Sequence, residues 1–355
     1  MFDSFSVKSR IKEYRVEFIG DFAEGIRGKI KDNFFLVIDK RVNEIYGGKI
    51  RDVFFEGNVV VIEANEESKT LSKCNELIKY FMERNVRRDS VVFAFGGGVV
   101  EDIVAFVSMI LFRGIDWVFY PTTLLAQADS CIGSKSSINV EGYKNLLGSF
   151  YPPTSVVIDV NFLKTLPPAE IKSGIGEILH FYLIGGKEDL ARKMMDEYEE
   201  LIVSPGMMEK YILPSLQIKK EVIERDELDR GERNKFNYGH TFGHAIESVS
   251  SYAINHGQAV TIGMDIANYI SMRAGVMETK IFDNIHTILK KNIPDFELSD
   301  SNTEAYFKAL SKDKKNIGAN LGCILARGLG DMFKMQLPMD DDFREYVKSY
   351  FRSYR

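Results

Sequence analysis

The chain has 355 residues, of which 45% are hydrophobic and 27% are charged, and its formal net charge is -5. This length favours two domains, and the composition is that of an ordinary globular protein rather than of a disordered or fibrous one. The negative net charge disfavours a surface for nucleic acid or for an anionic membrane, so any basic cluster should be local and should serve a small anion.

The cysteines and the apolar segments indicate a reducing compartment. The three cysteines are widely spaced and form no CxxC pair, so neither a disulfide framework nor a thiolate metal site is favoured. The N-terminus lacks the apolar core of a signal peptide, and the most hydrophobic stretch, residues 91–112, contains three glycines together with Glu101 and Asp102. We therefore expect a cytoplasmic protein without a membrane-spanning segment.

The first half of the chain alternates short apolar runs with amphipathic segments. The apolar runs are typical of buried strands, and residues 71–85 have helical spacing. The predicted strands cover residues 34–39, 59–64, 90–98, 117–120 and 155–160. They end in turn or capping residues, as at the ligand-binding edge of a doubly wound parallel sheet. The pattern predicts an α/β, Rossmann-like domain over residues 1–164.

The pattern changes after residues 165–168, TLPP. Long amphipathic segments dominate from Ala169 onward, and strand patterns almost disappear. We predict an all-α C-terminal domain over residues 165–355. The sequence contains no internal repeat, low-complexity tract or linker-like run, so the two domains are expected to pack closely.

Three consecutive glycines, Gly96, Gly97 and Gly98, follow a predicted strand and precede residues 99–114, which have helical spacing. Glycines at such a turn let the backbone approach a pyrophosphate, whose charge then lies at the helix N-terminus. The spacing is not GxGxxG, and a simple tight turn explains the glycines equally well. Asp39 ends an earlier predicted strand, where it can bond a ribose hydroxyl or act as an ordinary turn residue.

The histidines of the helical half suggest a metal site. His240 and His244 form HTFGH, whose i, i+4 spacing places both on one helical face. Glu177 precedes His180 by three residues on another predicted helix, and His256 follows later. A mixed glutamate and histidine site for a divalent ion such as zinc fits this pattern. The alternative is a chance pair of core histidines. The absence of HExxH disfavours a metalloprotease.

A third group of residues is cationic or polar. Most such side chains are merely solvated, but Lys135 lies in DSCIGSKSSIN, and Lys144 and Asn145 lie in GYKNLLGSF, glycine-bearing loops that follow strand signals. Loops of that kind bind anions. The full group is Arg113, Lys135, Lys144, Asn145, Lys219, Arg233, Asn237 and Lys314.

Taken in order, ten segments resemble the dehydroquinate synthase family, a branch of the sugar phosphate cyclases. The match runs from about residue 35 to about residue 330 and keeps long motif spacings, so it is far more specific than any single motif. Iron-type alcohol and glycerol-1-phosphate dehydrogenases share the general architecture, but PTTLLAQADS with GHTFGHAIE resembles the cyclases. The segments are NEESK, FAFGGGVVED, FRG, PTTLLAQADSCIGSK, GYKNLLGSFYPP, DVNFLKTLP, GIGEI, DELDRGERNKFNYGHTFGHAIE, HGQAV and KDKKNIG.

The resemblance implies a Rossmann-like NAD domain, a helical metal domain and an active site between them. It implies one divalent ion, zinc or cobalt, held by Glu177, His240 and His256, which leaves His244 outside the metal ligands. The implied NAD contacts are Asp39, Glu66, Lys69, Gly96, Gly97, Gly98, Asp102, Thr122 and Thr123, with Asp129 and Lys144 nearby. Substrate phosphate is implied to meet Lys135, Asn145, Asn237, His244, Lys314 and, across the interface of a homodimer, Arg113. Lys219 and Arg233 are implied to hold a substrate carboxylate, an anion matched by the guanidinium fork.

The family's reaction converts 3-deoxy-arabino-heptulosonate 7-phosphate into 3-dehydroquinate and phosphate, within the shikimate pathway to the aromatic amino acids. The resemblance implies transient oxidation of a secondary alcohol by NAD, elimination of phosphate, return of the hydride and ring closure by aldol addition. NAD is thereby regenerated. The enzyme would contribute mainly positioning and electrostatics, with the substrate's own phosphate as base.

The chain departs from the family pattern at His180 in GIGEILHFYLI, where dehydroquinate synthases carry a lysine that contacts substrate hydroxyls. Smaller departures are Ser134, within the family's GGK motif, and residues 136–139, where SSIN replaces TGVN. His180 is therefore a candidate substrate contact, the alternative being a histidine packed in the helical core. Two other functions stay open: a sibling cyclase for a different acidic sugar phosphate, and a degenerate homologue that binds NAD and metal without turnover. The retained metal ligands speak against degeneration.

Overall fold

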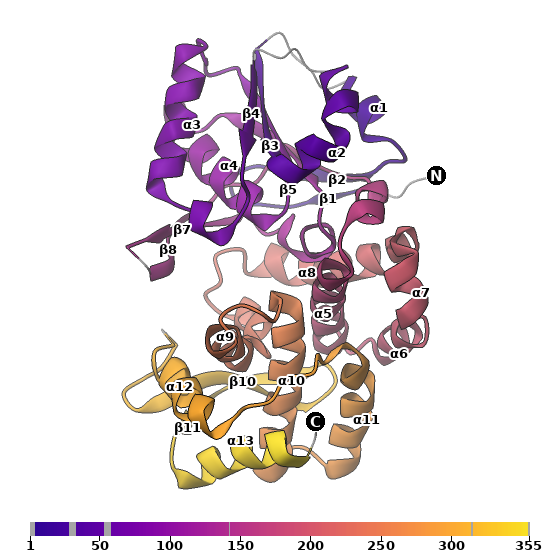
Figure 1. The fold of residues 1–355 in the computed structure, drawn as a ribbon, viewed down its shortest axis with the longest axis vertical. Coiled ribbons are helices and arrows are strands. Elements are labelled where there is room, and N and C mark those ends of the chain that lie inside the picture. The colour runs from indigo at the N-terminus through magenta and orange to yellow at the C-terminus, as the bar shows by residue number, and fades with distance from the viewer. Residues whose placement is uncertain (1–3, 28–32, 53–57, 142, 314, 354–355) are drawn as a thin grey trace. The chain divides into compact units, whose positions relative to one another are not determined.

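A computed structural model describes residues 4–27, 33–52, 58–141, 143–313 and 315–353. It divides the chain into two compact units (Figure 1). The first unit comprises Met1–Leu166 and Lys219–Leu228, and the second comprises Pro167–Ile218 and Asp229–Arg355. Every helix among the described residues is too short or too polar to cross a membrane.

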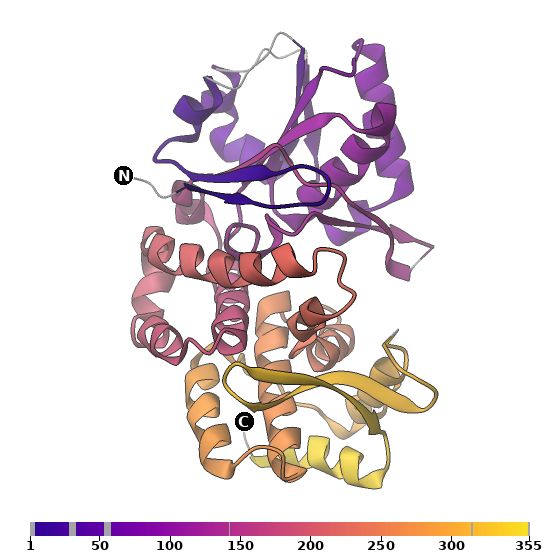
Figure 2. The same cartoon turned by 180° about the vertical axis from the view of Figure 1, so that it is seen from behind.

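The first unit is built on a seven-stranded sheet with the spatial order β1-β2-β9-β6-β5-β3-β4. Its strands are β1 (Ser4–Val7), β2 (Tyr14–Phe18), β3 (Phe34–Asp39), β4 (Val59–Ile62), β5 (Val91–Gly96), β6 (Asp116–Pro121) and β9 (Ser155–Ile158). Neighbouring strands are parallel except β1 and β2, the antiparallel pair seen at the sheet edge in Figure 2. The predicted parallel sheet is thus confirmed, and of its seven strands only β1 and β2 were not predicted.

Helices cover both faces of this sheet, which explains why its strands are continuous apolar runs. On one face, Leu36 and Phe95 pack with Phe22 of α1 (Phe22–Arg27) and Ile50 of α2 (Lys40–Arg51). On the other face, Phe35 contacts Phe81, with ring centroids 4.6 Å apart. Phe81 lies on α3 (Leu71–Glu83), which packs beside α4 (Gly98–Ile110).

A hairpin of β7 (Lys135–Val140) and β8 (Tyr143–Phe150) also belongs to the first unit. The sequence analysis placed Lys135, Lys144 and Asn145 in loops, which is wrong, because all three lie within these two strands. The reason is that β8 is exposed along most of its length. A strand with little burial lacks the apolar alternation by which strands are predicted.

The second unit is mainly helical. Its helices are α5 (Pro168–Ile184), α6 (Glu188–Asp196), α7 (Tyr198–Val203), most of α8 (Glu209–Arg225), α9 (His240–Val249), α10 (His256–Arg273), α11 (Thr279–Leu289), α12 (Asp300–Ser311) and α13 (Asp341–Ser353). It also contains the antiparallel pair β10 (Asn320–Gly328) and β11 (Asp331–Pro338), so the prediction of an all-α domain is wrong. Residues 321–326 are all buried, and such a run cannot be told from a buried helix by periodicity alone.

Glycines bring three helices of the second unit into backbone contact. A Cβ added to Gly176 of α5 would lie 2.1 Å from the carbonyl oxygen of Gly257, at the start of α10. A Cβ added to Gly263 of α10 would lie 2.0 Å from the carbonyl oxygen of Gly239, which precedes α9. Only glycine permits such approaches. The N-terminal end of α10 is therefore fixed against α5, and the N-terminal end of α9 is fixed against α10.

Candidate functional site

The predicted dinucleotide turn lies between β5 and α4. A Cβ on Gly96 would lie 2.3 Å from Val100 Cγ2, and one on Gly97 would lie 2.9 Å from Thr123 Cγ2. Both positions therefore exclude a side chain. Gly97 is the N-cap of α4, and the amide of Thr122 donates to the Gly96 carbonyl oxygen over 2.9 Å. The turn thus presents backbone at a helix N-terminus, where an anion is favoured.

Lys69 is the centre of a polar cluster beside this turn. Its side chain is only 7% exposed, and its Nζ lies 2.8 Å from Asp102 Oδ2 and 3.0 Å from both Ser137 Oγ and Asn145 Oδ1. Burial raises the pKa of Asp102, and Lys69 opposes that shift. Glu66 lies at the rim of the cluster, 3.6 Å from Lys69 Nζ. The structure thus brings together four of the predicted contact residues.

Sequence reasoning missed two residues that hold this cluster. Ser137 donates to Asp102 from its amide, over 2.7 Å, and from its hydroxyl, over 3.0 Å. Asn139 donates from Nδ2 to Glu66 Oε1 over 2.8 Å. Both belong to the SSIN segment of β7, where alternate side chains point to the same face. Their spacing of two residues was the available signal.

The remaining predicted residues of the first unit fall into two groups. Asp39 and Asp129 are engaged within the unit: Asp39 caps α2 by accepting from the Val42 amide, and Asp129 Oδ1 accepts from Lys219 Nζ over 2.7 Å. Thr123 is likewise engaged, since its Oγ1 accepts from the Ala126 amide. The exposed group consists of Arg113, Lys135 and Lys144.

In the second unit, three helices bring Glu177, His240 and His256 together. Each offers one ligand atom, and these atoms lie within 4.8 Å of one another. Glu177 Oε1 is 3.2 Å from His256 Nε2 and 3.7 Å from His240 Nε2. Metal–ligand bonds of 2.0 to 2.2 Å imply ligand atoms about 3.3 Å apart in a tetrahedral zinc site. The spacing therefore fits a divalent ion such as zinc.

Electrostatics support the same interpretation. Glu177 is 1% exposed, and among the described residues no donor reaches its Oε1 with hydrogen-bond geometry. Burial alone would raise the pKa of Glu177, but His240, His256 and His180 together hold it below its usual value. Burial lowers the pKa of His240 to about 3. An anionic carboxylate beside a neutral imidazole is the ligand chemistry that divalent zinc requires.

His256 has the opposite shift. Burial lowers its pKa, but the neighbouring carboxylates of Glu177 and Glu247 outweigh burial and raise the pKa well above 6.5. Its Nδ1 lies 3.3 Å from Glu247 Oε1. Sequence reasoning missed Glu247, although it follows His240 by seven residues, two helical turns, and so lies on the same face of α9. This seven-residue spacing could have identified Glu247 from the sequence.

His180 and His244 flank the three residues. His180 is 1% exposed, with its Nδ1 3.5 Å from Glu177 Oε2 and its ring centroid 4.9 Å from that of His240. His244 is exposed and stacks on His256 at 5.7 Å between centroids. His244 does not join the Glu177 group, but it forms a second potential ligand group with Glu247 and His256.

The other predicted residues of the second unit are Arg233, Asn237 and Lys314. Arg233 is buried, at 5% exposure, in the 3-10 helix Glu232–Asn237. Asn237 ends that helix, and its Nδ2 donates to the Asn234 carbonyl oxygen over 3.1 Å. Lys314 lies outside the described residues.

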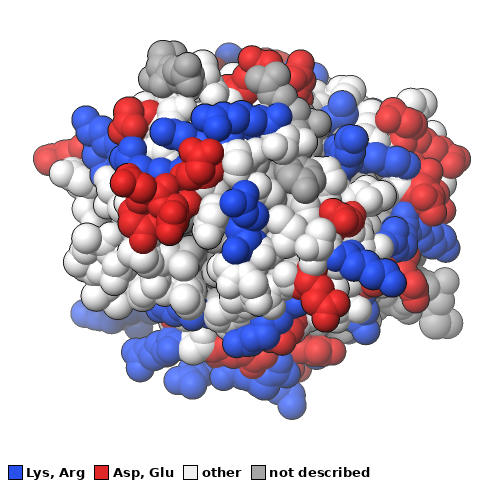
Figure 3. Space-filling model, turned by 90° about the horizontal axis from the view of Figure 1, so that it is seen from below, with Lys and Arg blue, Asp and Glu red and all other residues white. Residues whose placement is uncertain are grey.

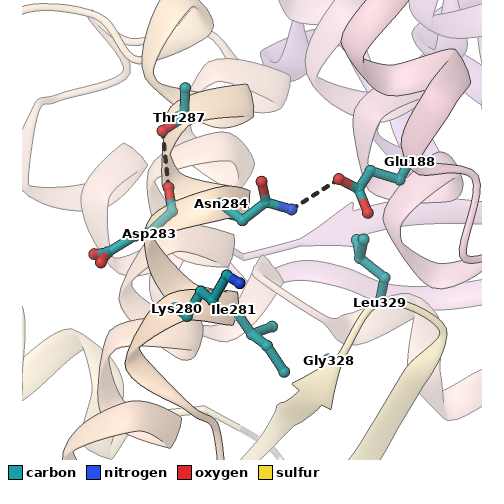
Figure 4. A pocket seen from close by; sticks show the side chains of 8 residues that line it. All are labelled: Glu188, Lys280, Ile281, Asp283, Asn284, Thr287, Gly328 and Leu329. Atoms are coloured by element: carbon teal, nitrogen blue, oxygen red, sulfur yellow. Dashed lines mark hydrogen bonds between the residues drawn. The ribbon is translucent and has the colours of Figure 1, made fainter.

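The second unit also has a hollow of about 750 Å³, lined by residues of α6, α11 and the β10–β11 turn (Figure 4). Asn284 donates there to Glu188 Oε1 over 2.7 Å, and Arg192 bonds both residues. None of the predicted site residues that the structure describes lines it. On the face drawn in Figure 3, the described acidic and basic side chains are interspersed, so that face has no single sign of charge.

Comparison with known proteins agrees over most of the chain. A family model described as 3-dehydroquinate synthase N-terminal matches residues 59–173, and one described as 3-dehydroquinate synthase C-terminal matches residues 174–316. The 3-dehydroquinate synthase of Alkaliphilus metalliredigens (strain QYMF) is 36% identical over 87% of this chain and 88% of its own length. That of Helicobacter pylori (strain G27) is 35% identical over 90% of this chain and 91% of its own length.

Two solved structures share the fold. A 2-deoxy-scyllo-inosose synthase complexed with carbaglucose-6-phosphate, NAD+ and Co2+ has a TM-score of 0.86 and 25% identity over 99% of this chain and 100% of its own. The 2-epi-5-epi-valiolone synthase ValA of Streptomyces hygroscopicus subsp. jinggangensis 5008, with NAD+ and Zn2+ bound, has a TM-score of 0.85 and 23% identity over 96% of this chain and 98% of its own.

Proposed function

The chain belongs to the 3-dehydroquinate synthase family, and from this premise we propose that it converts 3-deoxy-arabino-heptulosonate 7-phosphate into 3-dehydroquinate and phosphate. We propose NAD and one divalent ion, zinc or cobalt, as its cofactors. The observation that supports this most directly is the convergence of Glu177, His240 and His256 within 4.8 Å. When bound, the ion would acidify a substrate hydroxyl and NAD would accept and return a hydride.

The residues of the second unit would prepare the metal site. Glu177 would act as an anion, because the neighbouring imidazoles keep its pKa low. His240 and His256 would each present Nε2, since these atoms lie nearest to Glu177 Oε1. Two imidazoles and one carboxylate leave a coordination position open for a substrate oxygen. His180, beside Glu177, would tune recognition of the substrate hydroxyls.

The cationic residues would hold the two anionic ends of the substrate. We assign the carboxylate to Lys219 and Arg233, whose side chains are buried, since burial strengthens charge-assisted bonds. We assign the phosphate to Lys135, Asn145, Asn237, His244, Lys314 and Arg113. These assignments favour an acidic sugar phosphate over a neutral one.

The first unit would bind NAD at the carboxyl edge of its sheet. Gly96 to Gly98 would receive the pyrophosphate at the N-terminus of α4, with Thr122 and Thr123 beside them, Asp39 at the ribose, and Asp129 and Lys144 nearby. The Lys69 cluster would supply further contacts to the cofactor. Its hydrogen bonds to Asp102 and Ser137 are already formed, so little reorganisation would be needed on binding.

We also propose a homodimer that forms through the first unit and places Arg113 in the partner's site. Phe112 and Arg113 have positive φ, 53° and 66°, a costly conformation that directs the exposed Arg113 outward. Exposed apolar side chains lie on neighbouring α4 and β8, including Ile110 at 44% and Leu146 at 61%. Such side chains suit a covered surface. The three free, buried thiols suit the expected cytoplasmic location.

The test is turnover of the purified protein with NAD and Zn2+ or Co2+. Phosphate release should accompany formation of 3-dehydroquinate, identified by NMR, while NADH absorbance stays unchanged after the first turnover. A panel of seven-carbon acidic sugar phosphates and neutral sugar phosphates serves as the control. Faster turnover of another substrate would assign a sibling cyclase, and net accumulation of NADH would assign a dehydrogenase.

A further inference from the structure

The imidazoles of His256 and His240 each have an oxygen atom beside both ring nitrogens. His256 directs Nε2 toward Glu177 Oε1, at 3.2 Å, and Nδ1 toward Glu247 Oε1, at 3.3 Å. His240 directs Nε2 toward the same Glu177 oxygen, at 3.7 Å, and Nδ1 toward the Tyr238 carbonyl oxygen, at 3.2 Å. The two rings therefore have the same arrangement, with an acceptor behind each Nδ1.

This arrangement determines which nitrogen can bind a cation. A neutral imidazole carries its proton on one nitrogen and a lone pair on the other, and a hydrogen bond from one nitrogen fixes the proton there. An acceptor at Nδ1 leaves the lone pair on Nε2, which is the atom that faces Glu177. A carboxylate is a stronger acceptor than a carbonyl group, since it carries charge. Glu247 therefore fixes the ring of His256 more firmly than Tyr238 fixes the ring of His240.

Glu247 connects the two helices that carry His240 and His256. Its side chain is 15% exposed, and it lies on α9 while His256 opens α10, so it joins two helices whose close approach depends on glycine. We propose that Glu247 is a positioning residue, which fixes the tautomer and orientation of His256 and thereby sets the affinity of the site for its ion. This inference depends on the metal site of the proposed function.

A competing use of the same atoms is a second ion. His244, Glu247 and His256 each offer a ligand atom within 4.8 Å of the others. In that arrangement His256 would bind one ion through each nitrogen and would have to lose both ring protons. The two uses differ in stoichiometry, since a positioning role requires one ion per chain and a second site requires two.

The experiment measures metal binding to the full chain after the ion has been removed with a chelator. Zn2+ affinity is determined by competition with a chromophoric chelator for wild type, Glu247→Ala and Glu247→Gln, and the Co2+ absorption spectrum reports the ligand geometry.

Loss of a carboxylate behind a ligating histidine typically weakens metal binding by about 10- to 100-fold. We expect that loss for Glu247→Ala, with an altered Co2+ spectrum. Glu247→Gln, which keeps an oxygen acceptor, should recover part of the affinity. Glu199→Gln, on the exposed surface of α7, is the matched control.

The outcomes separate this inference from the proposed function. Unchanged affinity and an unchanged Co2+ spectrum in both Glu247 variants would overturn the positioning role, while wild-type turnover would still support the proposed function. Two equivalents of Zn2+ in wild type and one in Glu247→Ala would also overturn it, in favour of a second site. A wild-type chain that binds no ion and releases no phosphate would reject the proposed function itself. If Glu247→Ala does not fold, the isosteric Glu247→Gln decides by the same two measurements.

Discussion

Two buried glutamates, one in each unit, have opposite acid strengths. Glu101 lies in the first turn of α4 and is 7% exposed, and Glu177 lies on α5 and is 1% exposed. Burial raises the pKa of Glu101 to about 8, helped by Asp102 and Asp129 and opposed by a hydrogen bond from Ser130. Burial acts on Glu177 in the same direction, yet its histidine neighbours lower its pKa.

The difference shows that the neighbours, rather than the depth of burial, determine the charge state. Near neutral pH, Glu101 holds its proton and is a neutral hydrogen-bonding group of the first unit. Glu177 is an anion and a competent metal ligand. A cation beside Glu177 would thus meet a carboxylate that is already ionised. Glu101 would first have to lose its proton before it could attract a cation.

The largest effect is expected from His256→Ala, which removes one imidazole from the surroundings of Glu177. The substitution removes a proposed metal ligand and, with it, Lewis-acid assistance worth several kcal/mol. The kcat/KM value should fall by about 10³-fold or more, with a parallel loss of metal in elemental analysis. His286→Gln is the control, since His286 bonds Asp265 and lies outside both potential ligand groups. Full activity in verified metal-free protein would contradict the assignment.

The next effect, on stability, comes from Glu101→Gln. Because the pKa of Glu101 is raised from 4.5 to about 8, the stability it contributes is complete below pH 4.5 and is lost as the pH rises to about 8. Glutamine keeps the shape and does not titrate. At about 1.4 kcal/mol per pKa unit, the variant should gain up to roughly 4 kcal/mol relative to wild type between about pH 5 and about pH 9.

Urea unfolding at the two pH values measures this gain. The single tryptophan, Trp117, is buried in β6 and so reports on the unit that holds Glu101. Glu44→Gln, an exposed change on α2, should show no such dependence on pH. Equal pH profiles for wild type and Glu101→Gln would mean that Glu101 is ionised in the folded protein.

Smaller losses are expected from Lys219→Ala and Arg233→Ala, each of which removes one residue that we propose to hold the substrate carboxylate. Each charge-assisted bond is worth about 1.5 to 3 kcal/mol, so kcat/KM should fall roughly 10- to 150-fold with an acidic substrate. Lys220→Ala and Lys235→Ala are the neighbouring controls, since these lysines pair with Glu224 and Glu232. Wild-type kinetics in both test variants would indicate a neutral sugar phosphate.

The fold could be predicted where burial leaves a pattern. The runs that became β3 and β5 are buried on both faces and were recognised as strands. The exposed strand β8 and the fully buried residues 321–326 of β10 lack alternation, and both were missed. A continuous apolar run fits a strand or a buried helix equally well, so β3 and β5 were predicted from their alternation with amphipathic segments, a context that β10 lacks. An exposed strand such as β8 has no apolar run at all.

The candidate site could be predicted only in part, because its residues come from several helices. The spacing of His240 and His244 suggested a pair of ligands, but the atoms that group with Glu177 belong to His240 and His256. Spacing describes one helix, whereas His256 opens the next helix, and its place depends on the contact between Gly263 and Gly239. The resemblance to a family, rather than the periodicity, pointed to His256.

The smallest effect is expected at His180, on the rim of the Glu177 group. A lysine is longer than histidine, is nearly always protonated and only donates, whereas an imidazole with a reference pKa of about 6.5 donates or accepts. We expect His180→Lys to raise kcat/KM on the heptulosonate phosphate by about two- to tenfold, the value of one recovered hydrogen bond of roughly 0.5 to 1.5 kcal/mol. Comparative kinetics of wild type and variant measure this change.

The surroundings of His180 make the substitution informative in both directions. The site is 1% exposed, so a new ammonium group must find Glu177 or a substrate oxygen, or it will lose its proton. A gain in kcat/KM with unchanged metal content would show that the substrate oxygen is its partner and that His180 tunes specificity. Ordinary wild-type efficiency with no response would show that His180 is a packing residue, consistent with its ring contacts to Phe181 and Tyr238. A fall in metal content would show that the ammonium group pairs with Glu177 and competes with the ion for its carboxylate.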